Sequence, residues 1–211
     1  MKASKRSWFV GAPLFCALIP LVCIPAAEWM AVAPRGNDVF LWYVLILGFP
    51  ALAAAPILLA ALVGLAFPRV SSHAAILAFC SAAYVIAFVA ALRLGESIRM
   101  SAFHRLAERS QPLVAAIHEF EQKYGHPPES LQSLVPEFLP SVPSTGMAAY
   151  PEYRYTASAT NYHGNPWVIT VFTPSGGINF DQFMYFPLTN YPQRGYGGWL
   201  ERVGDWAYVH E

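Results

Sequence analysis

Charged residues are almost missing from the first part of the chain. Residues 8–92 contain only four of them, Glu28, Arg35, Asp38 and Arg69, although the whole chain carries thirteen acidic and thirteen basic side chains. Glu28 lies near the end of an apolar run, and no ionisable group falls in the middle of one. Because a transporter or a proton pathway needs polar groups at mid-depth in the membrane, this scarcity favours a passive anchor.

Cysteine is missing from residues 93–211. The three cysteines, Cys16, Cys23 and Cys80, all fall in apolar stretches, so the C-terminal part has neither a disulfide framework nor a cysteine-based zinc site. This part also lacks an excess of positive charge, with eight basic and eleven acidic side chains. Binding to nucleic acid needs a basic surface that neutralises phosphates, and we therefore expect no nucleic-acid partner.

Long apolar runs take the place of charge in the first part. Three runs, at about residues 8–30, 40–67 and 74–92, each approach or exceed the ~20 residues that a bilayer-crossing helix needs. A cleaved signal peptide is the alternative for the first run, since residues 31–33 read Ala-Val-Ala. Pro34 directly after that site and the length of the run favour an uncleaved anchor. We predict a membrane anchor at 1–92, in contact with the lipid bilayer through three transmembrane helices, and a second domain at 93–211.

The orientation in the membrane follows from positive charge in the short flanks. Three cations precede the first run and Arg69 follows the second, whereas Arg35 stands alone in the turn between them. The positive-inside rule then places the N-terminus in the cytoplasm and, after three crossings, the C-terminal domain outside it. Two arginines just after the third run favour the opposite orientation. We predict a bacterial inner-membrane protein with an extracytoplasmic domain.

A helical period resumes at Leu94 and runs to Tyr124, with apolar side chains on one face. Pro112 breaks one backbone hydrogen bond, which predicts either a bend or a second helix with Ser110 as its N-cap. We favour the bend. Gly125 supplies the positive φ that ends a helix.

A short second helix and a sheet are predicted beyond this break. Pro128 cannot continue the first helix, Leu131 and Leu134 restart an apolar stripe at helical spacing, and Pro140 and Pro143 mark the exit into strands. The predicted strands are 152–158, 167–172, 178–186 and 206–210. Helices followed by a small antiparallel sheet give an α+β fold.

The stretch 113–143 resembles the globular region of type II secretion pseudopilins, of the protein G kind, and of type IV pilins. The resemblance consists of a long helix, a Tyr124-Gly125 break, the pattern Pro128-x-x-Leu131-x-x-Leu134 and the exit Leu139-Pro140-x-x-Pro143. The ending GDWAYVHE around Trp206 is similar to that of bacterial membrane proteins that carry such a region. The resemblance covers about 94–211. It implies a pseudopilin-like fold and a structural or accessory role in an envelope or secretion assembly, with other envelope proteins as partners.

The start of the chain departs from the pilin pattern. Pilins begin with a short basic leader and a Phe-Thr-x-x-Glu-like start to a single transmembrane helix. Nothing similar precedes Ala74, Glu96 lies at the wrong end of the third run, and two further runs stand in front. We therefore expect a pilin-like module that stays in the membrane rather than a processed and polymerised subunit.

Two groups of residues have the composition of a metal site. His118 and Glu121 lie three residues apart on the predicted helix, and Asn179, Asp181 and Asp205 have side chains that suit calcium. A solvated helix face explains the first pair equally well, and calcium needs six to eight oxygen ligands, which this carboxylate-poor region does not supply. We predict no metal and no cofactor.

The ingredients of a catalytic triad are also present in the C-terminal part. Ser144, Ser158 and Ser175 share it with His163 and Asp181. No Gly-x-Ser-x-Gly elbow accompanies them, and such residues occur in most domains of this size. We predict that the protein is not an enzyme.

Aromatic residues are abundant in the C-terminal part, and most should form its core. Tyr191, Tyr196 and Trp199 lie in or beside a Pro/Gly-rich loop at 187–198, where burial is harder to arrange. Exposed aromatic rings can dock a protein partner or stack on a glycan. The leading hypothesis is a membrane-anchored interaction module. The alternative is a ligand-binding or sensing domain for an envelope component such as a glycan.

Overall fold

The computed structural model describes residues 2–157, 162–175, 179–192 and 198–210. The chain divides into two compact units. Met1–Met30 and Asp38–Ile98 form the first, named here the helical unit, and Ala31–Asn37 with Arg99–Glu211 form the second, named the sheet unit. The division confirms the α+β class, with helices first and a sheet last. It places residues 31–37 in the sheet unit, which the predicted boundary at 92 did not anticipate.

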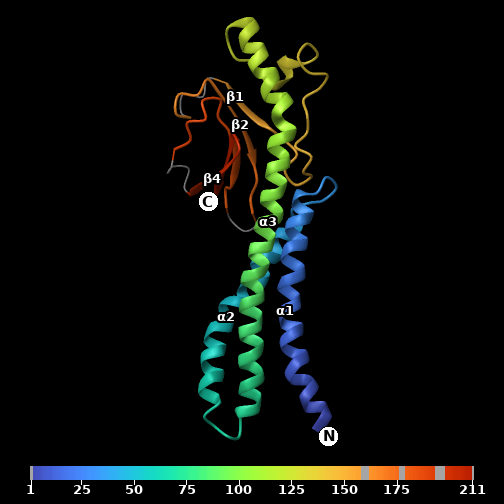
Figure 1. Ribbon diagram of the computed structural model, residues 1–211, viewed down its shortest axis with the longest axis vertical. Coiled ribbons are helices and arrows are strands. Elements are labelled where there is room, and N and C mark those ends of the chain that lie inside the picture. Colours follow the sequence, from blue (N-terminus) through green and yellow to red (C-terminus); the bar gives the residue numbers. More distant parts are fainter. Residues whose placement is uncertain (1, 158–161, 176–178, 193–197, 211) are drawn as a thin grey trace. The chain divides into compact units, whose positions relative to one another are not determined.

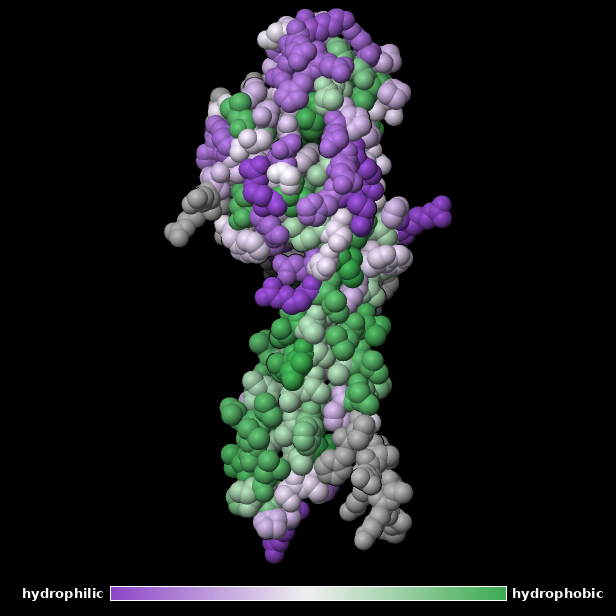
Figure 2. Space-filling model, in the orientation of Figure 1, coloured by the Kyte–Doolittle hydropathy of each residue, from purple (hydrophilic) through white to green (hydrophobic). Residues whose placement is uncertain are grey.

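Three helices are long and apolar enough to cross a membrane: α1 (Lys2–Val32), α2 (Trp42–Gly64) and α3 (Ser71–Tyr124). The short 3₁₀ helix η1 (Val39–Leu41) precedes α2. Large hydrophobic side chains are exposed on the helical unit, among them Phe15, Phe49 and Ile86, and Figure 2 shows such residues gathered along it. Side chains of this kind suit contact with lipid, so the prediction of three candidate spans is confirmed.

The helices of the helical unit pack closely at positions of small or polar residues. A Cβ added at Gly95 of α3 would lie 2.9 Å from Cγ of Glu28 of α1, and Glu28 itself is buried. Between α3 and α2, the Tyr84 hydroxyl donates a hydrogen bond to the Leu47 carbonyl over 2.8 Å. Small residues permit this close approach of helices in membranes, and polar side chains hydrogen-bond between them.

α3 is a single helix of 54 residues that continues through Pro112. Ser110 is buried, and its hydroxyl donates to the carbonyl of Leu106 one turn earlier, over 2.7 Å. A residue with this bond lies inside a helix rather than at an N-cap. The alternative in which a second helix begins at Ser110 is therefore wrong.

The end of α3 follows the predicted stop signal. Gly125 has φ 77°, and its N–H donates to the Glu121 carbonyl over 2.8 Å. The next element, η2 (Leu131–Leu134), is a 3₁₀ helix of four residues. Beyond it, Glu137 returns to the helix end, where it pairs with Lys123 and accepts the Tyr124 hydroxyl. The ion pair lowers the pKa of Glu137 and raises that of Lys123.

Five antiparallel strands form one sheet with the order β1-β2-β3-β5-β4. Their bounds are β1 (Arg154–Ala157), β2 (Trp167–Phe172), β3 (Gln182–Tyr185), β4 (Trp199–Val203) and β5 (Trp206–His210). The predicted bounds of β2 and β5 are confirmed. β1 and β3 are shorter than predicted, and β4 was missed because its Leu-Glu-Arg centre has no alternating pattern.

The main core of the sheet unit lies between α3 and one face of the sheet (Figure 1). Phe103 of α3 is fully buried, with ring centroids 4.8 Å from Phe183 and 4.7 Å from Tyr208. Further along the helix, His118 lies edge-on to Trp167 at 5.3 Å. Aromatic pairs at such spacings add to the stabilisation from buried area.

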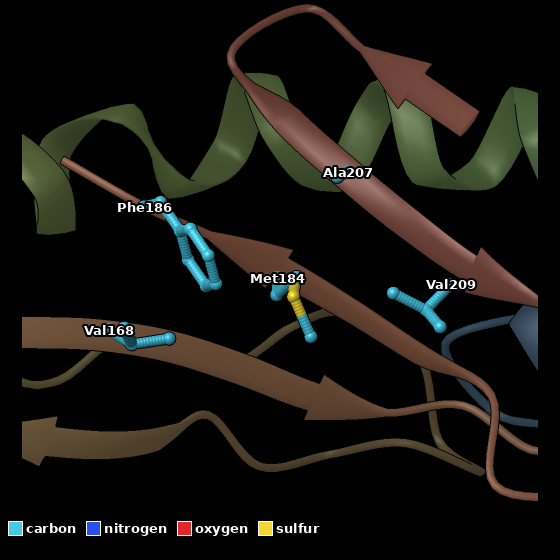
Figure 3. Close-up of a cluster of buried hydrophobic side chains, with 5 residues drawn as sticks. All are labelled: Val168, Met184, Phe186, Ala207 and Val209. Atoms are coloured by element: carbon cyan, nitrogen blue, oxygen red, sulfur yellow. The ribbon is translucent and has the colours of Figure 1, made fainter. Parts of the chain in front are cut away.

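The opposite face of the sheet is also buried. Figure 3 shows its cluster of hydrophobic side chains on β2, β3 and β5 and on Phe186, which directly follows β3; these side chains alternate along the chain with those that contact α3. Tyr162, Tyr191 and Leu200 pack against the cluster. Because both faces are covered, β2 reads as a nearly continuous buried strand instead of an alternating one. The cluster consists of Val168, Met184, Phe186, Ala207 and Val209.

Candidate functional site

Tyr191, the first residue of the predicted aromatic binding loop, is a packing residue. Its ring stacks on that of Phe186, with centroids 4.7 Å apart. The guanidinium carbon of Arg202 lies 4.4 Å from the centroid of the Tyr191 ring. Its hydroxyl accepts the Phe186 N–H over 2.8 Å and lies 2.7 Å from the Asp205 carbonyl oxygen. Burial raises the pKa of this hydroxyl. The expectation of an exposed ring is wrong for Tyr191, because its ring packs against the hydrophobic cluster on the second face of the sheet.

Trp199 begins the edge strand β4 instead of lying in the loop. Its side chain is 55% exposed and stacks on His210, with ring centroids 3.6 Å apart. His210 also contacts a carboxylate oxygen of Glu201 over 3.1 Å. Tyr196 lies outside the described residues. Trp199 is therefore an exposed ring at the sheet edge, whereas Tyr191 is partly buried against the second face of the sheet.

The residues predicted to define the fold are placed as follows. Leu134 is fully buried, and Pro128 is buried with its carbonyl accepting the Tyr155 hydroxyl over 2.9 Å. Trp206 stacks on Phe183 at 5.0 Å with nearly parallel rings. The remaining members of the set lie at or near the surface: Pro112 and Pro140 are exposed, whereas Leu131 and Pro143 are half-buried.

The metal candidates do not assemble into a cluster within the described part of the chain. His118 and Glu121 approach to 3.3 Å, but no third His, Cys, Asp or Glu among the described residues joins them or any other such pair. Asp181 is buried, and its carboxylate accepts the Tyr208 hydroxyl over 2.7 Å. His163 is exposed, and Ser158 lies outside the described residues.

A buried polar network holds the start of the sheet unit together. The guanidinium of Arg99 donates to the carbonyl of Thr173 over 2.8 Å, to that of Pro174 over 3.4 Å and to the Tyr150 hydroxyl over 3.3 Å. Arg99 is only 3% exposed. The network gives hydrogen-bond donors to two carbonyls of the segment that follows β2, and it thereby attaches this segment to α3.

The sheet unit also contains an open groove of about 460 Å³ between α3 and the turn that joins β4 to β5. One wall carries His104, Glu108 and Gln111, which are spaced four and three residues apart and so share a face of α3. The opposite wall carries the Gly204-Asp205 turn. Apolar and aromatic side chains complete the lining: Ala107, Val114, Ala115, Tyr185, Val203 and Trp206.

The groove is acidic. Glu108 and Asp205 contribute carboxylates from opposite walls, and none of its lining residues is lysine or arginine. Burial raises the pKa of the Tyr185 hydroxyl, and the negative charge of Asp205 raises it further. The charge of Asp205 therefore acts on the hydroxyl of Tyr185, which lines the same groove. An electronegative groove with aromatic walls can hold a cationic or a hydrogen-bond-donating group.

This groove was not predicted from the sequence, although the helical residues of one wall could be recognised as neighbours on one face. His104 and Glu108 form an i, i+4 pair that also fits an ordinary solvated helix face. The opposite wall depends on β4, and an unpredicted strand meant an unpredicted hairpin turn. Gly204, which has φ 62°, followed by Asp205 was the available signal, because this dipeptide is typical of tight turns.

Comparison of the chain with protein-family models, with curated proteins and with solved structures finds no match.

Proposed function

We propose that this protein is a membrane-anchored interaction module of the bacterial inner membrane. The helical unit is the anchor, and the sheet unit binds a partner in the cell envelope. The observation that carries the proposal is the groove beside the β4–β5 turn, which is lined by polar side chains of α3, by Asp205 and by the aromatic residues Tyr185 and Trp206. Three membrane-competent helices support the role of the helical unit as an anchor.

The pilin-like pattern of 113–143 supports a place in an envelope or secretion assembly. It consists of a helix, a Gly125 break and a proline-marked exit, and Gly125 has the backbone conformation that the pattern requires. The module would be an accessory or structural component that stays in the membrane. The proposed orientation has the N-terminus in the cytoplasm and the sheet unit outside it.

The orientation predicts the behaviour of a reporter fused after residue 211. Alkaline phosphatase folds and forms its disulfides only outside the cytoplasm, so we expect the fusion to be active in cells. A β-galactosidase fusion at the same position serves as the reciprocal control and should be inactive. The opposite pattern would reverse the orientation and place the partner in the cytoplasm.

The partner-binding role predicts site-specific crosslinking in living cells. Gln111 lines the groove and is exposed, so benzoylphenylalanine at this position should capture a distinct protein on irradiation. Thr156 is exposed on β1, at the sheet edge far from β4 in the strand order, and provides the matched control position. Equal adducts at both positions, or none at Gln111, would contradict a partner in the groove.

The alternative of a glycan-binding domain is favoured by one observation, the exposed indole of Trp199 stacked on His210. Rings held flat by a neighbour can stack on a sugar. Benzoylphenylalanine at position 199 separates the two candidates in the same experiment. A glycan adduct at 199 with nothing at 111 would favour the alternative.

A further inference from the structure

We propose that the groove recognises the charged end of a lysine or arginine side chain presented by the protein partner. This inference rests on the proposed function and names the chemistry of its site. The structure contributes three features: carboxylates on both walls, a tyrosine hydroxyl in the groove lining that is open to solvent, and an apolar lining that fits an aliphatic stem.

The carboxylates come from separate elements. Glu108 projects from α3 in the same row as His104 and Gln111, and Asp205 comes from the β4–β5 turn. Neither carboxylate forms an ion pair with a described residue. An ammonium or guanidinium group between the walls can donate charge-assisted hydrogen bonds to both carboxylates.

Tyr185 supplies the second feature. The residue as a whole is only 8% exposed and lines the groove, and its hydroxyl, which makes no hydrogen bond with a described residue, keeps contact with solvent. A hydroxyl oxygen that is open to solvent can accept a hydrogen bond from a donor that enters the groove. An ammonium or guanidinium group in the groove can therefore donate to Tyr185 as well as to the two carboxylates.

The third feature is the set of apolar and aromatic side chains that line the groove around these polar groups. Val114, Val203 and two alanines offer apolar surface, which suits the methylene stem of lysine or arginine. The rings of Tyr185 and Trp206 suit the cation at its tip. A sugar would need paired donors and acceptors around its ring, and the apolar lining does not provide them. An anion would meet two negative charges without a lining cation.

The test uses the full-length protein in phosphatidylcholine nanodiscs, with binding measured by saturation-transfer NMR. The probes are Nα-acetyl-lysinamide and Nα-acetyl-argininamide, and Nα-acetyl-norleucinamide is the neutral control of similar shape. We expect at least one cationic probe to bind about tenfold more tightly than the neutral one, a preference that equals about 1.4 kcal/mol. Equal binding of all three would overturn the inference.

Variants assign the preference to the groove. Asp205→Asn and Glu108→Gln should each reduce it severalfold, and Tyr185→Phe should weaken binding of the cationic probes while the protein keeps its melting temperature. Glu129→Gln changes an exposed carboxylate outside the groove lining and should have no effect. A preference that survives both carboxylate variants would place the cation elsewhere and refute the assignment.

Two further outcomes separate this inference from the proposed function. Glucosamine that binds more tightly than both amino-acid probes would overturn the assignment to a protein side chain. Crosslinking at Gln111 together with equal binding of charged and neutral probes would leave the interaction module standing and remove only its cation specificity.

Discussion

Replacing Arg99 by leucine is expected to lower the free energy of unfolding of the sheet unit by about 3 kcal/mol. The guanidinium donates to the carbonyls of Thr173 and Pro174 and to the Tyr150 hydroxyl. Leucine fills part of the volume but donates nothing. At least the buried Thr173 carbonyl would lose its 2.8 Å charge-assisted bond, and an unpaired buried acceptor keeps its full desolvation cost.

Pulse proteolysis in urea, with the protein in nanodiscs, measures this loss as a shift of the sheet unit's unfolding midpoint. Arg105→Leu provides the matched control, because Arg105 is an exposed arginine on the same helix and should change stability by less than about 0.5 kcal/mol. Equal midpoints for the Arg99 and Arg105 variants would mean that the buried network contributes no net stability.

Replacing Phe103 by alanine is expected to cost about 3–5 kcal/mol, the range for a large aromatic side chain removed from a packed core. Phe103 is fully buried between Phe183 and Tyr208, with centroid distances of 4.8 and 4.7 Å. The substitution therefore removes two aromatic contacts and leaves a cavity between α3 and the sheet. Such a loss approaches the whole stability of many domains.

The same urea experiment tests this substitution. Phe180→Ala removes the same side chain from a position that is 58% exposed, and it should shift the midpoint only slightly. Phe103→Leu should fall between the two because it keeps most of the buried volume. A Phe103→Ala midpoint close to that of Phe180→Ala would show that the contact between α3 and the sheet stabilises the unit little.

Much of this fold could be predicted because local rules decide it. The apolar runs fix three membrane-competent helices by their length, and Gly125 ends α3 because only a positive φ fits there. β2 and β5 have continuous β-prone sequences, and their predicted bounds match the structure. Each of these features depends on neighbouring residues alone.

The features that sequence reasoning missed depend on distant contacts. β4 is a strand because it pairs with β5 over five residues, although its own sequence does not alternate. Tyr191 was expected to be exposed because its loop is rich in proline and glycine, but the second face of the sheet needed a cover. A single sequence does not report which face a loop will cover.

The groove shows the same limit. His104 and Glu108 were visible as a helical pair, whereas Tyr185 and Asp205 join them from β3 and from the β4–β5 turn. The residues of the groove meet only after the sheet has formed. Their chemistry could therefore be recognised from the structure but not from their spacing along the chain.

The sheet unit is made of two separate stretches of the chain, and this determines how it can be prepared in soluble form. It consists of two stretches of sequence, Ala31–Asn37 and Arg99–Glu211, joined by the bond from the Ala148 N–H to the Ala33 carbonyl over 3.1 Å. A fragment cut from residue 96 onward would omit the first stretch. It would also leave Arg99 in the fraying first turn of a shortened helix. Expression of the unit therefore calls for a fusion in which residues 31–37 are tethered back to a helix that begins well before Arg99.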